Sequence, residues 1–155
     1  MPVRAVYVTR EGFKKFEEEL EHLRSVKRPQ VAERIRKAKE FTDTVDNAEY
    51  DEAKSEQAFV EGRIQEIEGT LANAQIIGEG PHPDYVALGS HVTVKDADGV
   101  EEKYKIVGSV EADPRHGLIS NESPVGRALL GKRAGERVSV DAPGGSFDLT
   151  VVEVA

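Results

Sequence analysis

Several residue types are missing or scarce in this chain, and each absence excludes a class of protein. The 155 residues include no cysteine, which rules out disulfides, thiolate metal sites and cysteine nucleophiles. Tryptophan is also absent, and only four Tyr and five Phe are available to build a core. No apolar run reaches the roughly 18 residues of a membrane span, and the apolar run at the start is too short for a signal peptide. We therefore expect a soluble, cytoplasmic protein with no membrane partner.

Positive charge is scarce as well. Lys and Arg number 21 against 29 Asp and Glu, which gives a formal net charge of −8. Because a nucleic-acid backbone attracts proteins with a positive surface, this balance disfavours nonspecific binding, and we expect no binding to free DNA. The glycine-rich motifs that hold nucleotide phosphates are missing too.

The distribution of glycine divides the chain near residue 78. Only three of the fourteen glycines precede Gly78, and the run Gly80-Pro81-His82-Pro83 predicts a linker. The division predicts an α+β protein, with a helical domain over residues 1–78 and a domain of strands and turns over residues 79–155.

The first helix is predicted to begin after Thr9, a favourable N-cap residue. Apolar residues then follow at helical spacing, as Phe13, Phe16, Leu20 and Leu23. The pattern resumes after Pro29 with Val31, Ile35 and Ala38, one position out of phase. Arg28-Pro29 therefore either ends a helix or inserts a kink into one long helix, and we favour the continuous, kinked helix.

A second helix is predicted from apolar positions that alternate spacings of three and four residues, as in a coiled coil. These positions are Tyr50, Ala53, Gln57, Val60, Ile64, Ile67, Leu71 and Ala74. Because residues 41–47 are a short connection, the two helices can bury their apolar faces by folding back as an antiparallel hairpin about 50 Å long. The pattern alone also fits a helical dimerisation arm.

Two carboxylates, Asp43 and Asp46, lie at the far end of this predicted hairpin. One interpretation is structural, with Asp46 as the N-cap of the second helix, Glu49 as its N3 partner and Asp43 capping a turn. The other is a metal site, since Mg²⁺ takes one or two protein carboxylates and keeps several waters. Two carboxylates alone bind Mg²⁺ weakly, so such a site requires a partner that supplies further ligands.

The second half predicts an antiparallel sheet of short strands with one helix packed on it. The predicted strands cover residues 90–94, 102–107, 117–120, 137–140 and 147–154. Ser123-Pro124 predicts the start of the helix, and Gly131 its end. The apolar residues Val125, Leu129 and Leu130 fit either an exposed docking patch or packing of this helix on the sheet.

The segment Asp43-Thr44-Val45-Asp46-Asn47-Ala48-Glu49-Tyr50 resembles the tip motif of the bacterial Gre transcript-cleavage factors. Further resemblance lies in the descending helix (residues 53–64) and in the second half, at residues 119–120, 123–132 and 140–145. It covers nearly the whole chain in matching order. It implies an N-terminal antiparallel coiled-coil hairpin and a C-terminal domain similar to the FK506-binding-protein fold, without prolyl isomerase activity.

The resemblance also implies a function. Such factors enter the secondary channel of bacterial multisubunit RNA polymerase and stimulate its own cleavage of backtracked RNA, so the chain is not itself expected to be an enzyme. Asp43 and Asp46 are implied to assist catalysis by holding a Mg²⁺ ion shared with the polymerase. The other implied site residues are Lys39, Lys54 and Tyr50 toward the RNA 3′ end, Asn47 and Glu49 supporting the tip, and Ser123, Pro124 and Arg127 docking on the polymerase. We expect a monomer.

The tip departs from the usual pattern of the family. Asp46 stands where a longer Glu is usual, and Thr44 and Val45 replace a Leu and a polar residue. Family members with altered acidic tips occupy the channel and inhibit transcription without promoting cleavage, and this is the alternative function. The intact residues 47–50 favour the cleavage factor.

Overall fold

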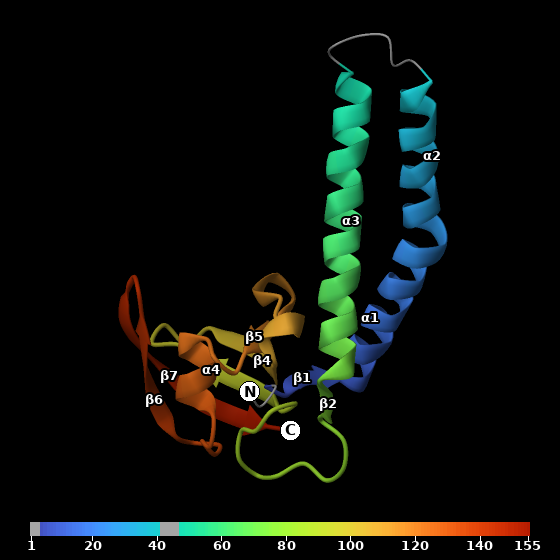
Figure 1. Ribbon diagram of the computed structural model, residues 1–155. Helices are drawn as coiled ribbons and strands as arrows, with labels where there is room; N and C mark the ends of the chain where they lie inside the picture. Colours follow the sequence, from blue (N-terminus) through green and yellow to red (C-terminus); the bar gives the residue numbers. More distant parts are fainter. Residues whose placement is uncertain (1–3, 41–46) are drawn as a thin grey trace. The chain divides into compact units, whose positions relative to one another are not determined.

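The computed structural model describes residues 4–40 and 47–155. Contacts divide it into a helical unit, Phe13–Asn73, and a second unit that combines Met1–Gly12 with Ala74–Ala155. The division at residues 78 and 79 that glycine content suggests differs from this one. The reason is that strand β1 (Val6–Thr9), which precedes the helices in the sequence, pairs with strand β2 (Ala74–Ile77), which follows them (Figure 1).

The helical unit consists of an ascending arm and a descending helix (Figure 1). The arm runs without interruption through α1 (Arg10–His22), the π-helical turn η1 (Leu23–Lys27) and α2 (Arg28–Lys39), and α3 (Ala48–Ala72) returns beside it. The predicted kinked helix is confirmed, and its kink is the π turn, in which the Arg28 N–H donates to the Leu23 carbonyl. Pro29 has no N–H and crowds the preceding turn, which accounts for an irregularity here.

The core of the hairpin is the predicted apolar seam. Its buried members are Leu20, Leu23, Val31, Ile35, Ala53, Val60, Ile64 and Ile67, with Phe16, Tyr50 and Leu71 packed against them. The seam is one position shorter than predicted, because Ala74, its last predicted member, belongs to strand β2. Helical spacing therefore identified the face that each arm buries.

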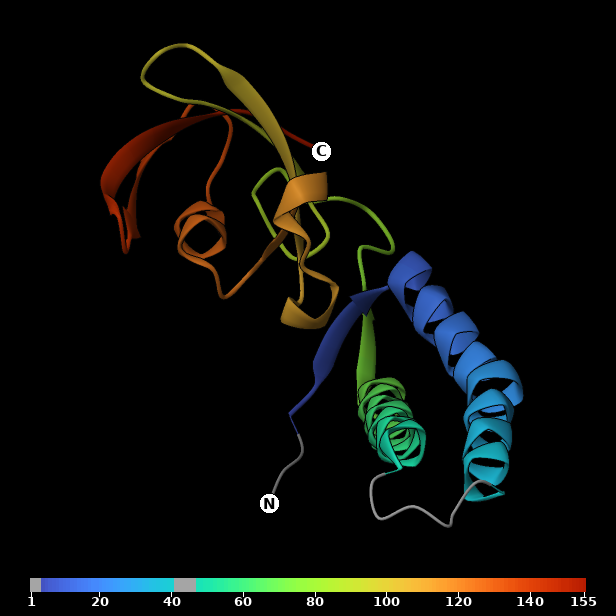
Figure 2. The same ribbon diagram turned by 90° about the horizontal axis from the view of Figure 1, so that it is seen from above.

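Strands β1 and β2 form a parallel pair that the sequence analysis did not predict. Val6 lies opposite Ala74 and Thr9 opposite Ile77, as the view in Figure 2 shows for the strands. Thr9 also caps α1 as predicted, since its Oγ1 accepts the Gly12 N–H at 3.0 Å. The Glu111 carboxylate in turn accepts the Thr9 N–H at 3.0 Å, so the residue that caps α1 is held by the 3₁₀ turn Ser109–Glu111 of the same unit.

The larger sheet has five strands in the order β5-β4-β3-β7-β6. Their bounds are β3 His91–Lys95, β4 Glu101–Val107, β5 Leu118–Ser120, β6 Arg137–Ala142 and β7 Gly145–Val154. The predicted antiparallel sheet needs one correction, because β5 runs parallel to β4. Two 3₁₀ turns, η2 (Ser109–Glu111) and η3 (Pro114–His116), carry the chain back so that both strands run in the same direction.

Helix α4 (Pro124–Leu129) packs on this sheet and completes its core. The predicted cap is confirmed, because Ser123 Oγ accepts the Gly126 N–H at 3.1 Å. A side chain at Gly126 would place its Cβ only 2.0 Å from the Ser120 carbonyl oxygen, so this position requires glycine. In residues 4–40 and 47–155, no helix is both long enough and apolar enough to span a membrane.

Candidate functional site

Asn47 closes the described end of the hairpin. Its Nδ2 donates to the Ala38 carbonyl at 2.8 Å, across from the end of α2. Its Oδ1 accepts the Tyr50 N–H at 3.1 Å, which makes Asn47 the N-cap of α3. One side chain thus joins the last turn of the ascending arm to the first turn of the descending helix.

This arrangement corrects the capping interpretation of the sequence. The N-cap is Asn47 and not Asp46, so Glu49 stands at the second helical position instead of the third. There the Glu49 carboxylate lies in the first turn of α3, where negative charge stabilises a helix. Asp43 and Asp46 themselves lie outside the described residues, between the two ends that Asn47 holds together.

The other residues implied at the tip differ in exposure. Lys39, the last residue of α2, and Lys54 in α3 are both exposed. The Lys54 ammonium group donates to Gln57 Oε1 at 2.9 Å, and neither lysine forms an ion pair with a described residue. Tyr50 is half-buried and packs against the hairpin core, as its position in the predicted apolar seam indicates.

Ion pairs between arginine and glutamate link the two arms. Arg63 pairs with Glu19 at 2.7 Å, Arg24 with Glu68 at 2.7 Å, and Arg28 with Glu61 at 2.9 Å, while Arg34 lies against Glu56. Each pair is partly exposed and so contributes at most about 1 kcal/mol. Together they favour one register of the arms, because a slip along the hairpin breaks all of them.

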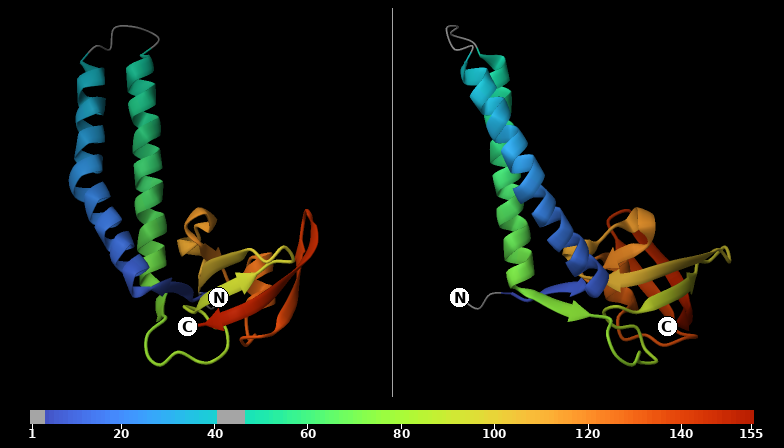
Figure 3. Two further views of the ribbon diagram at one scale, coloured as in Figure 1. Left: turned by 180° about the vertical axis from the view of Figure 1, so that it is seen from behind. Right: turned by 90° about the vertical axis from the view of Figure 1, so that its right-hand side faces the viewer.

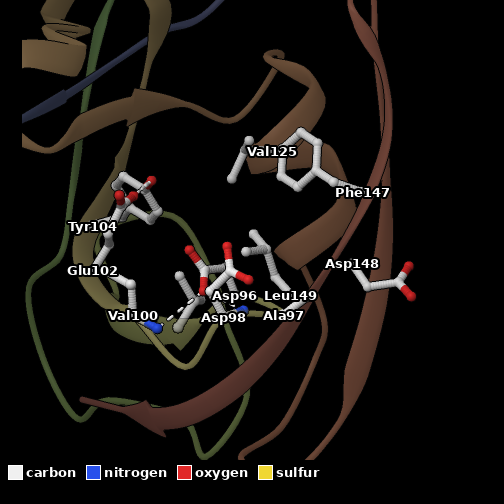
Figure 4. Close-up of a pocket in the computed structure, with 11 residues that line it drawn as sticks. Asp96, Ala97, Asp98, Val100, Glu102, Tyr104, Val125, Phe147, Asp148 and Leu149 are labelled. Atoms are coloured by element: carbon white, nitrogen blue, oxygen red, sulfur yellow. Dashed lines mark hydrogen bonds between the residues drawn. The ribbon is translucent and has the colours of Figure 1, made fainter.

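The second unit carries an apolar pocket of about 500 Å³ that the sequence analysis did not identify (Figure 4). Phe147 and Val125 lie across the pocket from Tyr104, and Leu149 lies between them. Phe147 remains 43% exposed although it is apolar. The sequence offered one signal, the alternation of Phe147, Leu149 and Val151, but that pattern does not show that the pocket is open.

Carboxylates surround one side of this pocket. Asp96 Oδ1 accepts the N–H groups of Asp98 and Val100 at 2.9 and 3.0 Å, which shapes the turn between β3 and β4. The Tyr104 hydroxyl donates to the Glu102 carboxylate, and burial together with that carboxylate raises the pKa of Tyr104 to about 12. Asp148 points away from the pocket (Figure 4) and pairs with Arg137 at 2.8 Å.

The implied docking residues lie at the start of α4. Ser123 caps the helix and also donates through Oγ to the Ser120 carbonyl at 2.7 Å, while Arg127 is exposed. Leu129 is fully buried in the core. Packing on the sheet therefore accounts for Leu129, and the interpretation of Val125, Leu129 and Leu130 as an exposed patch is wrong for that residue.

Within residues 4–40 and 47–155, no group of three or more His, Asp or Glu side chains is positioned to hold a metal ion. His116 Nδ1 contacts Asp113 Oδ2 at 2.6 Å. His91 is exposed at the start of β3, and partial desolvation of its ring, with the charges of Lys105 and His82 nearby, lowers its pKa.

Comparison with known proteins assigns both halves of the chain. Residues 6–76 match the family model described as "Transcription elongation factor, N-terminal", and residues 81–155 match "Transcription elongation factor, GreA/GreB, C-term". Together the two matches cover nearly all of the sequence.

Individual relatives agree with this assignment. The chain is 52% identical over 153 residues to transcription elongation factor GreA of Caldanaerobacter subterraneus subsp. tengcongensis, covering 97% of this chain and 98% of the relative. It is 50% identical over 149 residues to GreA of Bacillus subtilis, covering 96% and 95%. Among solved structures, GreA factor homolog 1 (Gfh1) of Thermus thermophilus is 31% identical, with a TM-score of 0.46 and coverage of 98% and 99%. The chain belongs to the GreA/GreB family of transcription elongation factors.

Proposed function

We propose that this chain is a cytoplasmic factor that enters the secondary channel of bacterial RNA polymerase and stimulates the polymerase's own Mg²⁺-dependent cleavage of backtracked RNA. The observation that carries the proposal is the position of Asn47. Its bonds to Ala38 and Tyr50 fix the two ends of the segment that contains Asp43 and Asp46. The acidic pair is therefore presented from a braced helical hairpin.

In this proposal the polymerase is the enzyme and the chain completes its site. Asp43 and Asp46 supply carboxylate oxygens, which are ligands that Mg²⁺ prefers. A Mg²⁺ ion held by these carboxylates together with the polymerase would lower the pKa of an attacking water and neutralise charge on the scissile phosphate. The two carboxylates alone are a weak site, so the isolated chain holds no ion and the function depends on the partner.

The residues beside the tip contact the RNA 3′ end. Lys39 and Lys54 are exposed on facing arms close to Asn47, where their ammonium groups reach phosphate oxygens and position the strand without reading its sequence. Tyr50 is half-buried, so only the exposed part of its ring is available to the RNA. Asn47 and Glu49 support the tip from the first turn of α3.

The C-terminal domain, residues 79–155, docks a monomer of the chain at the rim of the channel. Ser123, Pro124 and Arg127 form the start of a short helix beside the apolar pocket, which Val125 of the same helix helps to line. An exposed aromatic residue in an apolar pocket is typical of a residue that contributes strongly to binding. Asp96, Asp98 and Glu102 on its rim favour a partner surface that carries positive charge.

Two observations favour activation over inhibition. The chain is about half identical to several proteins named GreA and 31% identical to Gfh1. It also keeps the residues that form the Asn47 cap and first turn of α3. The inhibitory alternative rests on Asp46, whose side chain is one methylene shorter than the usual Glu.

The test is a transcript-cleavage assay on a defined backtracked elongation complex. We expect cleavage with the wild type, and loss of cleavage with Asp43→Ala and with Asp46→Ala while both variants still compete for polymerase. If the wild type binds the polymerase without cleavage, and Asp46→Glu gains cleavage, the inhibitory alternative is correct.

A further inference from the structure

The ascending arm contains one residue more than its packing requires. Its seam positions, buried or half-buried, are Phe16, Leu20, Leu23, Lys27, Val31, Ile35 and Ala38. A regular coiled coil alternates spacings of three and four, but the steps from Leu23 through Lys27 and Val31 to Ile35 are all four. The part of the seam from Val31 onward is therefore displaced by one residue.

The π turn η1 absorbs this displacement. In it the Arg28 N–H donates to the Leu23 carbonyl five residues earlier, one residue further back than in an α-helix. The turn therefore holds an additional residue while α1 and α2 both keep their apolar faces toward α3. Removal of one residue from η1 restores alternating spacings of three and four, with the long stem of Arg28 at the seam position that Lys27 now occupies.

The π turn is also the place where the arm changes direction. Figures 1 and 3 show that the axes of α1 and α2 differ and that the change falls at η1. The arm is fixed at both ends, by the Thr9 cap at the start of α1 and by Asn47 at the end of α2. Because the arm starts at the Thr9 cap, the bend at η1 determines where the end of α2, and with it Asn47, lies.

We propose that the additional residue of η1 is a positioning insertion, which sets the bend of the arm and thereby the placement of the acidic tip in the polymerase active site. This inference rests on the proposed function, because it concerns the placement of Asp43 and Asp46. A π turn is rare and, inside an α-helix, is found frequently at functional sites, so its presence in an otherwise regular hairpin points to a geometric role. Displacements of about 1 Å at a reacting centre are enough to cost a hundredfold in rate.

Proline must be separated from residue number in the test. Pro29 alone disfavours a regular α-helix, because it lacks an N–H and its ring meets the preceding turn. All the test variants therefore carry Pro29→Ala. The first has no further change, and the second also lacks Ser25. A third variant combines Pro29→Ala with deletion of Gln65, an exposed residue of α3 where no π turn can absorb the loss.

Thermal unfolding followed by circular dichroism decides whether the residue is an insertion. We expect the variant without Ser25 to melt within about 5 °C of Pro29→Ala, whereas the variant without Gln65 melts about 10 °C lower or more. The difference arises because deletion of Gln65 rotates Ile67 and Leu71 out of the seam. Equal losses in both deletion variants would overturn the proposal.

Cleavage kinetics decide whether the insertion positions the tip. We expect Pro29→Ala to keep wild-type cleavage, and the variant without Ser25 to lose about tenfold to a hundredfold in the cleavage rate at saturating factor, with unchanged affinity for polymerase. Wild-type cleavage by the variant without Ser25 would overturn the positioning role. If the wild type itself does not promote cleavage, the proposed function fails and the positioning role with it, while the melting temperatures still decide the insertion.

Discussion

Asn47 shows what a single residue contributes to this hairpin. Its amide group satisfies a carbonyl of the last turn of α2 and an N–H of the first turn of α3 at the same time. Only a side chain with both a donor and an acceptor can do this. The cap falls one residue later than the sequence suggested, on a residue whose amide can also donate to Ala38, which a carboxylate cannot do.

Substitution of Asn47 separates these two contributions. Asn47→Asp keeps the acceptor for Tyr50 and loses the donor to Ala38, whereas Asn47→Ala loses both. We expect Asn47→Asp to lower the free energy of unfolding by about 1 kcal/mol and Asn47→Ala by about 2 kcal/mol. Urea unfolding of the full chain measures both values. An Asn47→Ala variant as stable as Asn47→Asp would show that the cap contributes nothing.

Tyr104 provides a pH-dependent signal from the pocket. Burial and Glu102 raise its pKa to about 12 in the folded chain, above the value near 10 of an unperturbed tyrosine. The unfolded chain therefore loses this proton first, and Tyr104 makes the fold less stable as the pH rises from about 10 through 12. In an absorbance titration at 295 nm, we expect Tyr104→Phe to remove a component with a midpoint near 12. Removal of a component near 10 instead would contradict this environment.

At the scale of elements, local patterns were predictable and distant pairing was not. The helices, the kink and the caps at Thr9 and Ser123 follow from neighbouring residues. Strands β1 and β2 have only four residues each, and they pair Val6 with Ala74 across the whole hairpin, a relation that no local pattern carries. The parallel β4–β5 pair escaped prediction for the same reason. The pocket requires residues of β3, β4, α4 and β7 together, so only the folded chain shows it.

The glycine in the middle of α3 yields a prediction at this scale. Apart from its chain neighbours and the backbone of its own helix, no atom of the described residues lies within 4 Å of where a Cβ would stand at Gly62. Because glycine costs a helix interior conformational entropy, Gly62→Ala should raise the stability of the chain by about 0.5–1 kcal/mol, measured by urea unfolding. Gly126→Ala, at which a Cβ would collide with the Ser120 carbonyl, serves as the opposite case and should destabilise the fold. Loss of stability in Gly62→Ala would contradict the open surroundings of this residue.

For the whole molecule, the proposed function gives the two units separate tasks. In the proposed function, the pocket and the start of α4 are to supply affinity for the polymerase, and Asp43 and Asp46 are to supply ligands to its active site. Such a division lets binding and catalysis be altered independently, since residues without shared partners act additively. The net charge of −8 disfavours nonspecific binding to nucleic acid.

A charge placed in the pocket tests the docking task. Phe147→Asp should weaken the affinity for polymerase by at least about tenfold and leave cleavage at saturating factor unchanged. Val152→Asp is the matched control, because Val152 lies on the same strand with nearly equal exposure, 42% against 43%, and does not line the pocket. Equal effects of the two substitutions on affinity would show that the pocket is not the docking surface.

The most direct test of the account is the Mg²⁺ dependence of RNA cleavage by a backtracked polymerase complex at saturating factor, with the wild type and with Asp43→Asn. If the tip supplies a metal ligand, Asp43→Asn should raise the Mg²⁺ concentration required for half-maximal cleavage by at least about tenfold, the lower limit seen when even an outer partner of a metal site is lost. High Mg²⁺ should then restore much of the rate. An unchanged Mg²⁺ dependence would contradict the central claim that the tip of this hairpin helps to hold the metal.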